Sequence, residues 1–278
     1  MLCSSLFESW FPLVSIFTFA FINPIFAYAF TVVVSSIFFT TVVIFRKKHL
    51  EIKKEALKDL SLTSFFITTM FVFIFTGASL TTAGNVAVIM FMQLFFSFVY
   101  FNIIGKESIS LLHLFGAVLM GTGAIIILFP GEFKINLGDI LVLIAATLAP
   151  IANYYQKRAR GYVSSEVILA FRSIVAIPFL FLLGFLFNEV PTLEDLQGGF
   201  WFIILNGVVL MGISKIFWIE SIFRVSITKA SALAALIPVF TLIFAYFTLD
   251  EVPTYLQILG VVPVVVGGFL ITRPLKPV

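Results

Sequence analysis

The chain has few charged residues and few residues that carry redox, metal or acid–base chemistry. Of its 278 residues, 11% are charged, two are His and one, Cys3, is a cysteine. A single cysteine excludes an intramolecular disulfide framework, and an isolated thiol is usually inert. His49 and His113 stand apart, and the chain has no HExxH, no GxSxG and no cluster of Cys and His. We therefore expect no enzyme, no metal and no cofactor.

Basic residues are too few and too scattered to indicate nucleic acid as a partner. The net charge is only +3, and most Lys and Arg lie in short connections between apolar runs, where membrane topology accounts for them. The first 45 residues contain no Lys or Arg, which argues against a cleaved signal peptide with a basic first region.

Hydrophobic residues, in contrast, make up 61% of the chain. The mean hydropathy of +1.15 is far above that of a soluble domain, and a bilayer core requires about 20 apolar residues per helix. The predicted fold class is an all-α polytopic membrane protein in a lipid bilayer. The apolar runs predict ten transmembrane helices, at 4–21, 25–45, 61–78, 83–104, 110–129, 138–156, 164–187, 200–221, 228–248 and 254–272.

The second half of the chain repeats the first. Residues 105–130 match residues 249–274 without a gap. Because each unit holds five spans, the second copy must enter the bilayer in the opposite orientation, which is the inverted-repeat plan of secondary transporters. We place the two five-helix repeats at 1–133 and 134–278.

Prolines occur at matching places in the first helix of each repeat, where Pro12 aligns with Pro150. A proline inside a helix removes a backbone hydrogen bond and bends the helix. Interruptions at matching positions of inverted halves indicate a midplane binding site. We assign both prolines a gating role, with a purely structural bend as the alternative.

The distribution of Lys and Arg predicts the orientation. With a cytoplasmic N-terminus, the inside segments hold fourteen basic residues and the outside segments hold only Lys134. The long connection 46–59 is basic, whereas the connection 188–199 contains acidic residues and no basic one. The positive-inside rule then makes both termini cytoplasmic in the plasma (bacterial inner) membrane.

Several sequence features carry a family resemblance. The segments 105–108 (GKES) and 249–252 (LDEV) each precede a glycine-spaced helix, Pro238 lies in the ninth span, and the segment 218–226 (WIESIFRVS) joins the eighth span to the ninth. These features resemble the drug/metabolite transporter (DMT) superfamily, specifically its EamA-type ten-helix members. The resemblance implies a bundle in which helices 1, 3, 4, 6, 8 and 9 surround a central cavity, while helices 5 and 10 form a packing scaffold. It implies alternating access without ATP.

Glycines and carboxylates recur around the fifth and tenth spans. We expect Glu107 and Glu251 at helix N-termini, where the helix dipole favours a carboxylate, with gating as a second role. The segment 121–123 (GTG) is not a nucleotide loop, because no strand precedes it. The glycines interpreted as close-packing positions in lipid are Gly116, Gly121, Gly123, Gly260, Gly267 and Gly268.

Three ionisable side chains, Glu8, Arg172 and Lys215, fall inside predicted spans. Charge in the membrane core costs about 3 kcal/mol or more unless it is paired or hydrated. Counted from the cytoplasmic ends, all three lie roughly 7 to 12 Å deep, at about 1.5 Å per residue, and share one polar layer. The alternatives are snorkelling of the two cations to the interface and a place for Glu8 at the membrane surface.

Lys215 is the strongest candidate for substrate contact. It interrupts the apolar run 208–218 on a cavity helix, and the repeat-related residue is Phe71. We hypothesise that Glu8 pairs with Lys215 and releases it when a substrate carboxylate, a proton or another coupling ion arrives. Arg172 lies on helix 7, which the resemblance places away from the cavity, so a coupling or gating role competes with a structural one.

Neutral polar and aromatic side chains form a second set of candidates. Asn153 follows Pro150 by one turn, and Trp218 shares the helix face of Lys215. Hydrogen bonding between helices is the alternative role for each, and for Asn206 as well. The remaining candidates for substrate binding are Asn85, Gln93, Tyr154 and Ser214.

The predicted function is secondary transport, as export, of a small organic metabolite that is amino-acid-like or otherwise amphipathic. The alternative is a channel or a non-transporting membrane scaffold.

Overall fold

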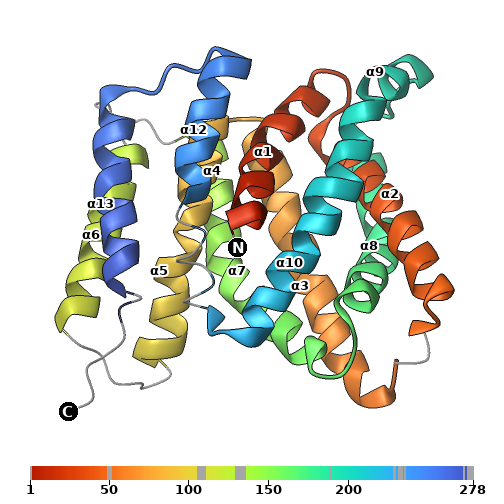
Figure 1. Ribbon diagram of the computed structural model, residues 1–278. Helices are drawn as coiled ribbons and strands as arrows, with labels where there is room; N and C mark the ends of the chain where they lie inside the picture. Colours follow the sequence, from red (N-terminus) through yellow and green to blue (C-terminus); the bar gives the residue numbers. More distant parts are fainter. Residues whose placement is uncertain are drawn as a thin grey trace.

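The computed structural model describes residues 2–48, 52–104, 111–128, 136–187, 189–227, 230, 234, 236–271 and 273. All regular structure in these residues is helical (Figure 1). The elements are α1 Leu2–Phe19, α2 Pro24–Phe45, α3 Lys54–Ala78, α4 Ala83–Phe91, α5 Gln93–Phe98, η2 Val99–Ile104, α6 Leu111–Leu128, α7 Leu137–Arg160, α8 Ser165–Phe187, α9 Leu193–Ile204, η3 Leu205–Ile213, α10 Ser214–Arg224, α12 Leu236–Leu249 and α13 Tyr255–Ile271.

These elements form ten rods, because α4, α5 and η2 continue one another, as do α9, η3 and α10. The elements η2 and η3 are π-helical. In the described part of the chain, six rods are long and apolar enough to cross a membrane, and four shorter apolar helices accompany them. The prediction of an all-α polytopic membrane protein is confirmed.

Two helices begin earlier than predicted. The basic connection was expected to last to residue 59, but α3 begins at Lys54, and α9 begins at Leu193 rather than near residue 200. A capping box explains the second start, because Thr192 and Asp195 exchange hydrogen bonds between side chain and backbone. Polar helical turns of this kind extend beyond the apolar run that a bilayer requires.

The rods run side by side in two inverted five-helix sets. In Figure 1, α6 and α13 form a pair at one edge, and α2, α8 and α9 lie at the other. Chain direction is opposite in the two sets, since α1 runs towards the end at which α7 begins. The α6–α13 and α2–α8 pairs each join corresponding helices of the two sets.

The α6–α13 contact depends on glycine. A Cβ atom at Gly116 would lie 2.7 Å from the carbonyl oxygen of Gly267, and one at Gly123 would lie 2.6 Å from that of Gly260. The predicted close packing is therefore confirmed for these positions. It is wrong for Gly121, because a Cβ there would meet nothing within 4 Å among the described atoms.

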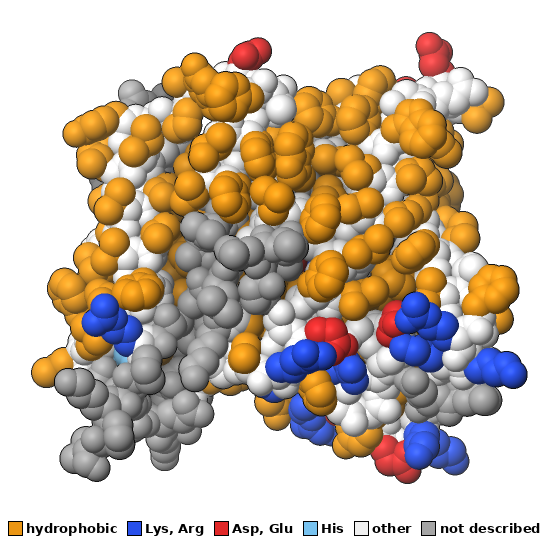
Figure 2. All heavy atoms as spheres, in the orientation of Figure 1, with side chains coloured by type: hydrophobic (Ala, Val, Ile, Leu, Met, Phe, Trp, Pro, Cys, Tyr) orange, Lys and Arg blue, Asp and Glu red, His pale blue; other side chains and the backbone are white. Residues whose placement is uncertain are grey.

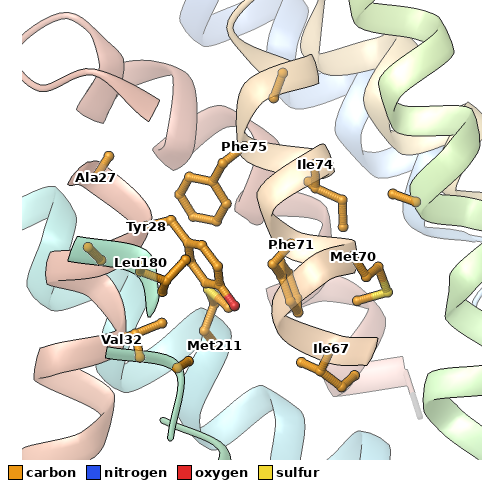
Figure 3. Close-up of a cluster of buried hydrophobic side chains, with 14 of the residues drawn as sticks. Ala27, Tyr28, Val32, Ile67, Met70, Phe71, Ile74, Phe75, Leu180 and Met211 are labelled. Atoms are coloured by element: carbon orange, nitrogen blue, oxygen red, sulfur yellow. The ribbon is translucent and has the colours of Figure 1, made fainter. Parts of the chain in front are cut away.

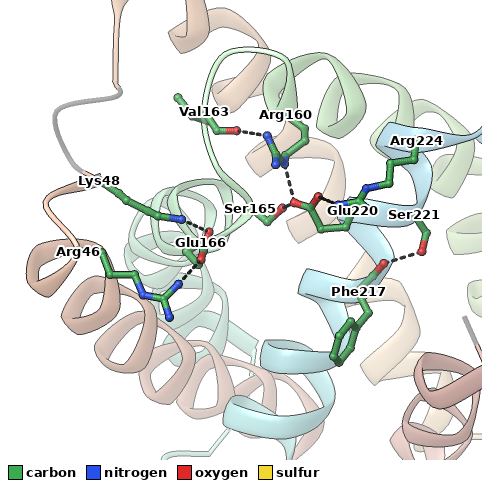
Figure 4. Close-up of polar contacts among 10 residues, drawn as sticks. All are labelled: Arg46, Lys48, Arg160, Val163, Ser165, Glu166, Phe217, Glu220, Ser221 and Arg224. Carbon is green, nitrogen blue, oxygen red and sulfur yellow. Dashed lines mark hydrogen bonds and ion pairs between the residues drawn. The ribbon is translucent and has the colours of Figure 1, made fainter.

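Charged side chains gather at the ends of the bundle. On the face shown in Figure 2, Lys and Arg lie towards one end, which we call the basic end, and acidic side chains alone mark the opposite, acidic end. At the basic end, Glu166 pairs with Arg46 and Lys48, which joins α8 to α2. Glu220 of α10 pairs with Arg160 and accepts a hydrogen bond from Ser165 (Figure 4).

Aromatic side chains fill the interior between α2 and α3. Tyr28 stacks on Phe75 with ring centroids 4.8 Å apart, and its ring lies 5.7 Å from that of Phe71. Figure 3 shows the Tyr28 hydroxyl directed towards Met211 of η3. This cluster packs the wall behind the central cavity.

Candidate functional site

A cavity of about 100 Å³ lies at the centre of the bundle. Its lining comes from α1, α3, α4, α5, α7, α10 and α12, the rods that the family resemblance implied, and in addition from α8 through Arg172. Most of the lining is apolar. The polar side chains that line it are Glu8, Gln93, Asn153, Gln156, Arg172, Lys215 and Trp218.

Glu8 and Lys215 form an ion pair across the cavity. Nζ of Lys215 lies 3.1 Å from Oε1 of Glu8, and only 17% and 14% of the two side chains is exposed. Ser214 donates to the same carboxylate oxygen at 3.4 Å, and the Lys215 ammonium lies 6.0 Å from the ring centroid of Phe71. The predicted pairing is confirmed. Glu8 lines the cavity, and its place within the membrane stays a prediction.

Trp218 and Asn153 form the second polar contact of the cavity. The indole Nε1–H of Trp218 donates to Oδ1 of Asn153 at 2.9 Å, and both side chains are buried. Pro150 lies inside α7 one turn before Asn153, and Pro12 of α1 lines the cavity directly. Gln93, at the start of α5, also lines it.

Arg172 is not peripheral, although its helix was expected to be. The residue is only 6% exposed and contributes to the cavity wall. Nη1 donates to Oε1 of Gln156, and Nη2 donates to the carbonyl oxygen of Met211, both at 3.4 Å. Because α8 packs on α2 and α3, its inward face reaches the cavity between them. Snorkelling to the interface is excluded by this burial.

Gln156 is a site residue that the sequence interpretation missed. It is 1% exposed, lines the cavity and holds the Arg172 guanidinium. The signal was available, because Ala149, Asn153 and Gln156 follow the i, i+4, i+7 spacing of one helix face. All three line the cavity.

Three predicted binding residues, Ser214, Tyr154 and Asn85, do not line the cavity. Ser214 only contacts Glu8, which does line it. Tyr154 is 41% exposed and stacks with Phe101 outside the cavity, because it lies about 100° around α7 from Asn153. Asn85 lies at the start of α4, where it donates to Asp139 of α7 and accepts from Gln257 of α13. Its role is to join helices at the acidic end.

Two further predictions concern carboxylates and a buried amide. The Glu251 carboxylate lies at the N-terminus of α4, where it accepts hydrogen bonds from the backbone N–H groups of Ala83 and Gly84. This helix is not the one that follows Glu251 in the chain. Glu107 lies outside the described residues.

Asn206 of η3 is fully buried, and neither polar atom of its side chain has a hydrogen-bond partner in the described ranges. The expected interhelical bond is therefore wrong for Asn206.

Comparison with known proteins is consistent with this architecture. The model of the EamA-like transporter family matches residues 1–129 and 136–273. The uncharacterized transporter YoaV of Bacillus subtilis is 25% identical, over 82% of this chain and 80% of its own length. An uncharacterized transporter of Archaeoglobus fulgidus is 23% identical, over 74% of this chain and 72% of its own.

One solved crystal structure superposes with a TM-score of 0.73 at 16% identity, covering 98% of this chain and 94% of that one. At this identity the likeness shows the fold alone. The family model, in contrast, matches both halves of the chain and shows the family. The described helices and the relatives, which are named transporters, agree with that match. The chain belongs to the EamA-like transporter family of the DMT superfamily, and it is a non-enzymatic, multi-pass membrane transporter of a small-molecule substrate.

Proposed function

We propose that the protein is a secondary transporter that exports a small organic metabolite, amino-acid-like or otherwise amphipathic, by alternating access. The observation that carries this proposal is an ion pair, Glu8 with Lys215, inside a cavity enclosed by apolar helices. Ionisable groups at such a place are costly and mark substrate or ion pathways. The cavity volume of about 100 Å³ suits a small solute better than a drug-sized ligand, whose pockets measure roughly 300 to 1,000 Å³.

The proposed binding residues are those that line the cavity with polar groups. Lys215, Trp218 and Asn153 present an ammonium, an indole and an amide to it, and Gln93 adds a second amide. Ser214 acts through Glu8, whose carboxylate accepts a hydrogen bond from the Ser214 hydroxyl. Phe71 and Met70 provide apolar contact area. An amphipathic solute satisfies both kinds of surface.

Coupling is proposed to work through the Glu8–Lys215 pair. A proton that binds Glu8 neutralises its carboxylate, and a substrate carboxylate beside Lys215 takes the place of Glu8. Either event separates the two side chains. Because the pair joins α1 to α10, its separation loosens two of the cavity walls.

The moving units are proposed to be the repeats 1–133 and 134–278, with Pro12 and Pro150 as the matching bends. Polar contacts join the two units at both ends of the bundle. Asp59 pairs with Arg158 at the basic end, and Glu251 binds the start of α4 at the acidic end. Alternating access requires one of these sets to break while the other holds.

The proposed location is the plasma (bacterial inner) membrane, with both termini cytoplasmic. Support comes from the gathering of Lys and Arg at one end of the bundle (Figure 2) and the positive-inside rule. The basic end is then cytoplasmic, and export starts there.

Counterflow in proteoliposomes tests the proposal. Purified protein is reconstituted and loaded with unlabelled solutes from a broad panel of amino acids, organic acids, amines and nucleosides. Uptake of a labelled solute accelerated by the same solute inside is expected of a carrier, whereas a channel shows no trans-acceleration. Lys215→Ala is expected to lose exchange while inserting normally, and exposed Lys58→Ala is the control. Absence of exchange across the whole panel contradicts the proposed function.

A further inference from the structure

Arg172 carries a buried positive charge that no acidic side chain balances in the part of the chain that the structure describes. None of the ion pairs there includes it. Its two acceptors, the Gln156 amide and the Met211 carbonyl, are neutral and lie at 3.4 Å. Usual N–H···O distances are about 2.7 to 3.2 Å, and a guanidinium offers five donors. The Arg172 side chain is therefore poorly satisfied.

The charge balance of the cavity follows from this. Its described charged lining residues are Glu8, Arg172 and Lys215, which carry −1, +1 and +1 and sum to +1. Glu8 and Lys215 compensate each other at 3.1 Å, so the remaining charge is on Arg172. A buried charge without a counter-ion is unfavourable in a protein interior surrounded by lipid.

The surroundings of Arg172 suit a carboxylate. Beside the central cavity lies a second space of about 10 Å³, also lined by Arg172, which is close to the minimum that one water molecule requires. Four hydroxyl side chains line this space with Arg172: Tyr28, Ser35, Thr68 and Ser173. In the central cavity, Arg172 shares the lining with the apolar side chains of Met70 and Phe71. The guanidinium thus borders a small space that four hydroxyl groups line and, in the central cavity, apolar walls that can contact the body of a solute whose carboxylate binds Arg172.

We infer that Arg172 is the anion-binding residue of the transport cavity, and that the transported solute is a small organic monocarboxylate with an apolar body. The inference rests on the proposed function and names its substrate class. A planar guanidinium binds a carboxylate through two parallel hydrogen bonds. The bound carboxylate compensates the unbalanced charge on Arg172 rather than that of Lys215. Of the two ways to separate the Glu8–Lys215 pair given above, the inference therefore selects protonation of Glu8.

Matched solutes test the charge class. Three bodies, propyl, benzyl and indolylmethyl, are each supplied as the carboxylate, the alcohol and the amine, and their binding is measured by thermal shift and by counterflow. We expect the carboxylate of at least one body to bind at least tenfold more tightly than its alcohol and amine. Preference for an amine or an alcohol in all three sets overturns the inference.

Two variants test the residue. Arg172→Gln is expected to weaken carboxylate binding at least tenfold, but it also removes a buried side chain that packs the wall. Gln156→Glu keeps Arg172 and the shape of its neighbour while supplying a fixed counter-charge at the 3.4 Å contact. We expect the same loss of carboxylate binding with an unchanged or higher Tm. Carboxylate binding retained in Gln156→Glu overturns the role of Arg172.

Failure of the proposed function looks different from failure of this inference. If the wild-type protein exchanges neither the matched sets nor the broad panel, transport itself is contradicted. If it exchanges amines or alcohols in preference to carboxylates, transport holds and only the substrate class is wrong.

Discussion

Nζ of Lys215 lies 3.1 Å from Oε1 of Glu8, and this contact joins α10 to α1 inside the cavity. Removing one partner leaves the other charge buried and uncompensated, which costs about 3 to 5 kcal/mol. We expect Lys215→Met and Glu8→Gln each to lower the Tm of the detergent-purified protein. The double variant should recover most of that loss, since it leaves neither charge behind.

Counterflow measurements on the same three variants distinguish a role of the Glu8–Lys215 pair in transport from a role in stability alone. If the pair couples transport, the double variant is stable but inactive. A stable and fully active double variant shows instead that the pair only supports the fold.

The Trp218–Asn153 contact gives a second cycle. Trp218→Phe removes the indole donor and leaves the buried Asn153 oxygen unpaired, at a cost of about 1 to 3 kcal/mol. Adding Asn153→Leu removes that penalty, so thermal unfolding should show the double variant near the wild type. Solute affinity is expected to fall in both variants because both side chains line the cavity. Unchanged affinity in the stable double variant contradicts their assignment to the binding site.

Glu251 stabilises the start of α4 from the other half of the chain. A carboxylate at a helix N-terminus contributes about 1 kcal/mol, so Glu251→Gln should speed amide exchange at Ala83 and Gly84 by roughly fivefold in hydrogen–deuterium exchange. Glu194→Gln is the matched control, because Glu194 is an exposed carboxylate in the first turn of α9. Equal effects at both helix starts would contradict a specific tie between the halves.

At the basic end, Glu220 holds α10 against α7 and α8 through Arg160 and Ser165 (Figure 4). Glu220→Gln removes the charge from this contact, and we expect the basic end to open more often. The reporter is Ala149→Cys on the cavity wall, in a Cys3→Ser background that leaves no other thiol. A membrane-impermeant thiol reagent should label it severalfold faster from the basic side. Exposed Glu55→Gln serves as control, and equal labelling rates contradict a gating role for Glu220.

The sequence predicts the helices well because bilayer thickness sets the length of each apolar run. It also locates Lys215 and Glu8, since a charge within such a run is conspicuous. Hydropathy alone does not report which face of a helix lines a cavity. On α7 the i, i+4, i+7 spacing of Ala149, Asn153 and Gln156 carried that information, and because it was not used, Tyr154 was assigned to the cavity and Gln156 was missed. Contacts between distant segments, such as Glu251 with α4, depend on packing that no local pattern records.

Two glycines on α6 provide the sharpest test of the scaffold formed with α13. A Cβ at Gly123 would lie 2.6 Å from the Gly260 carbonyl oxygen and 2.7 Å from Val264, whereas a Cβ at Gly121 would meet nothing within 4 Å. Gly123→Ala should therefore separate the two helices and cost about 1 to 3 kcal/mol. Gly121→Ala should be neutral or stabilising by up to about 1 kcal/mol, because alanine favours the helix. Thermal unfolding of the two variants, two residues apart on one helix, compares them directly. If both variants lose stability equally, backbone contact with α13 is not the reason for glycine at position 123. A loss of stability confined to Gly123→Ala, with normal substrate affinity, assigns α6 and α13 to packing rather than to the binding site.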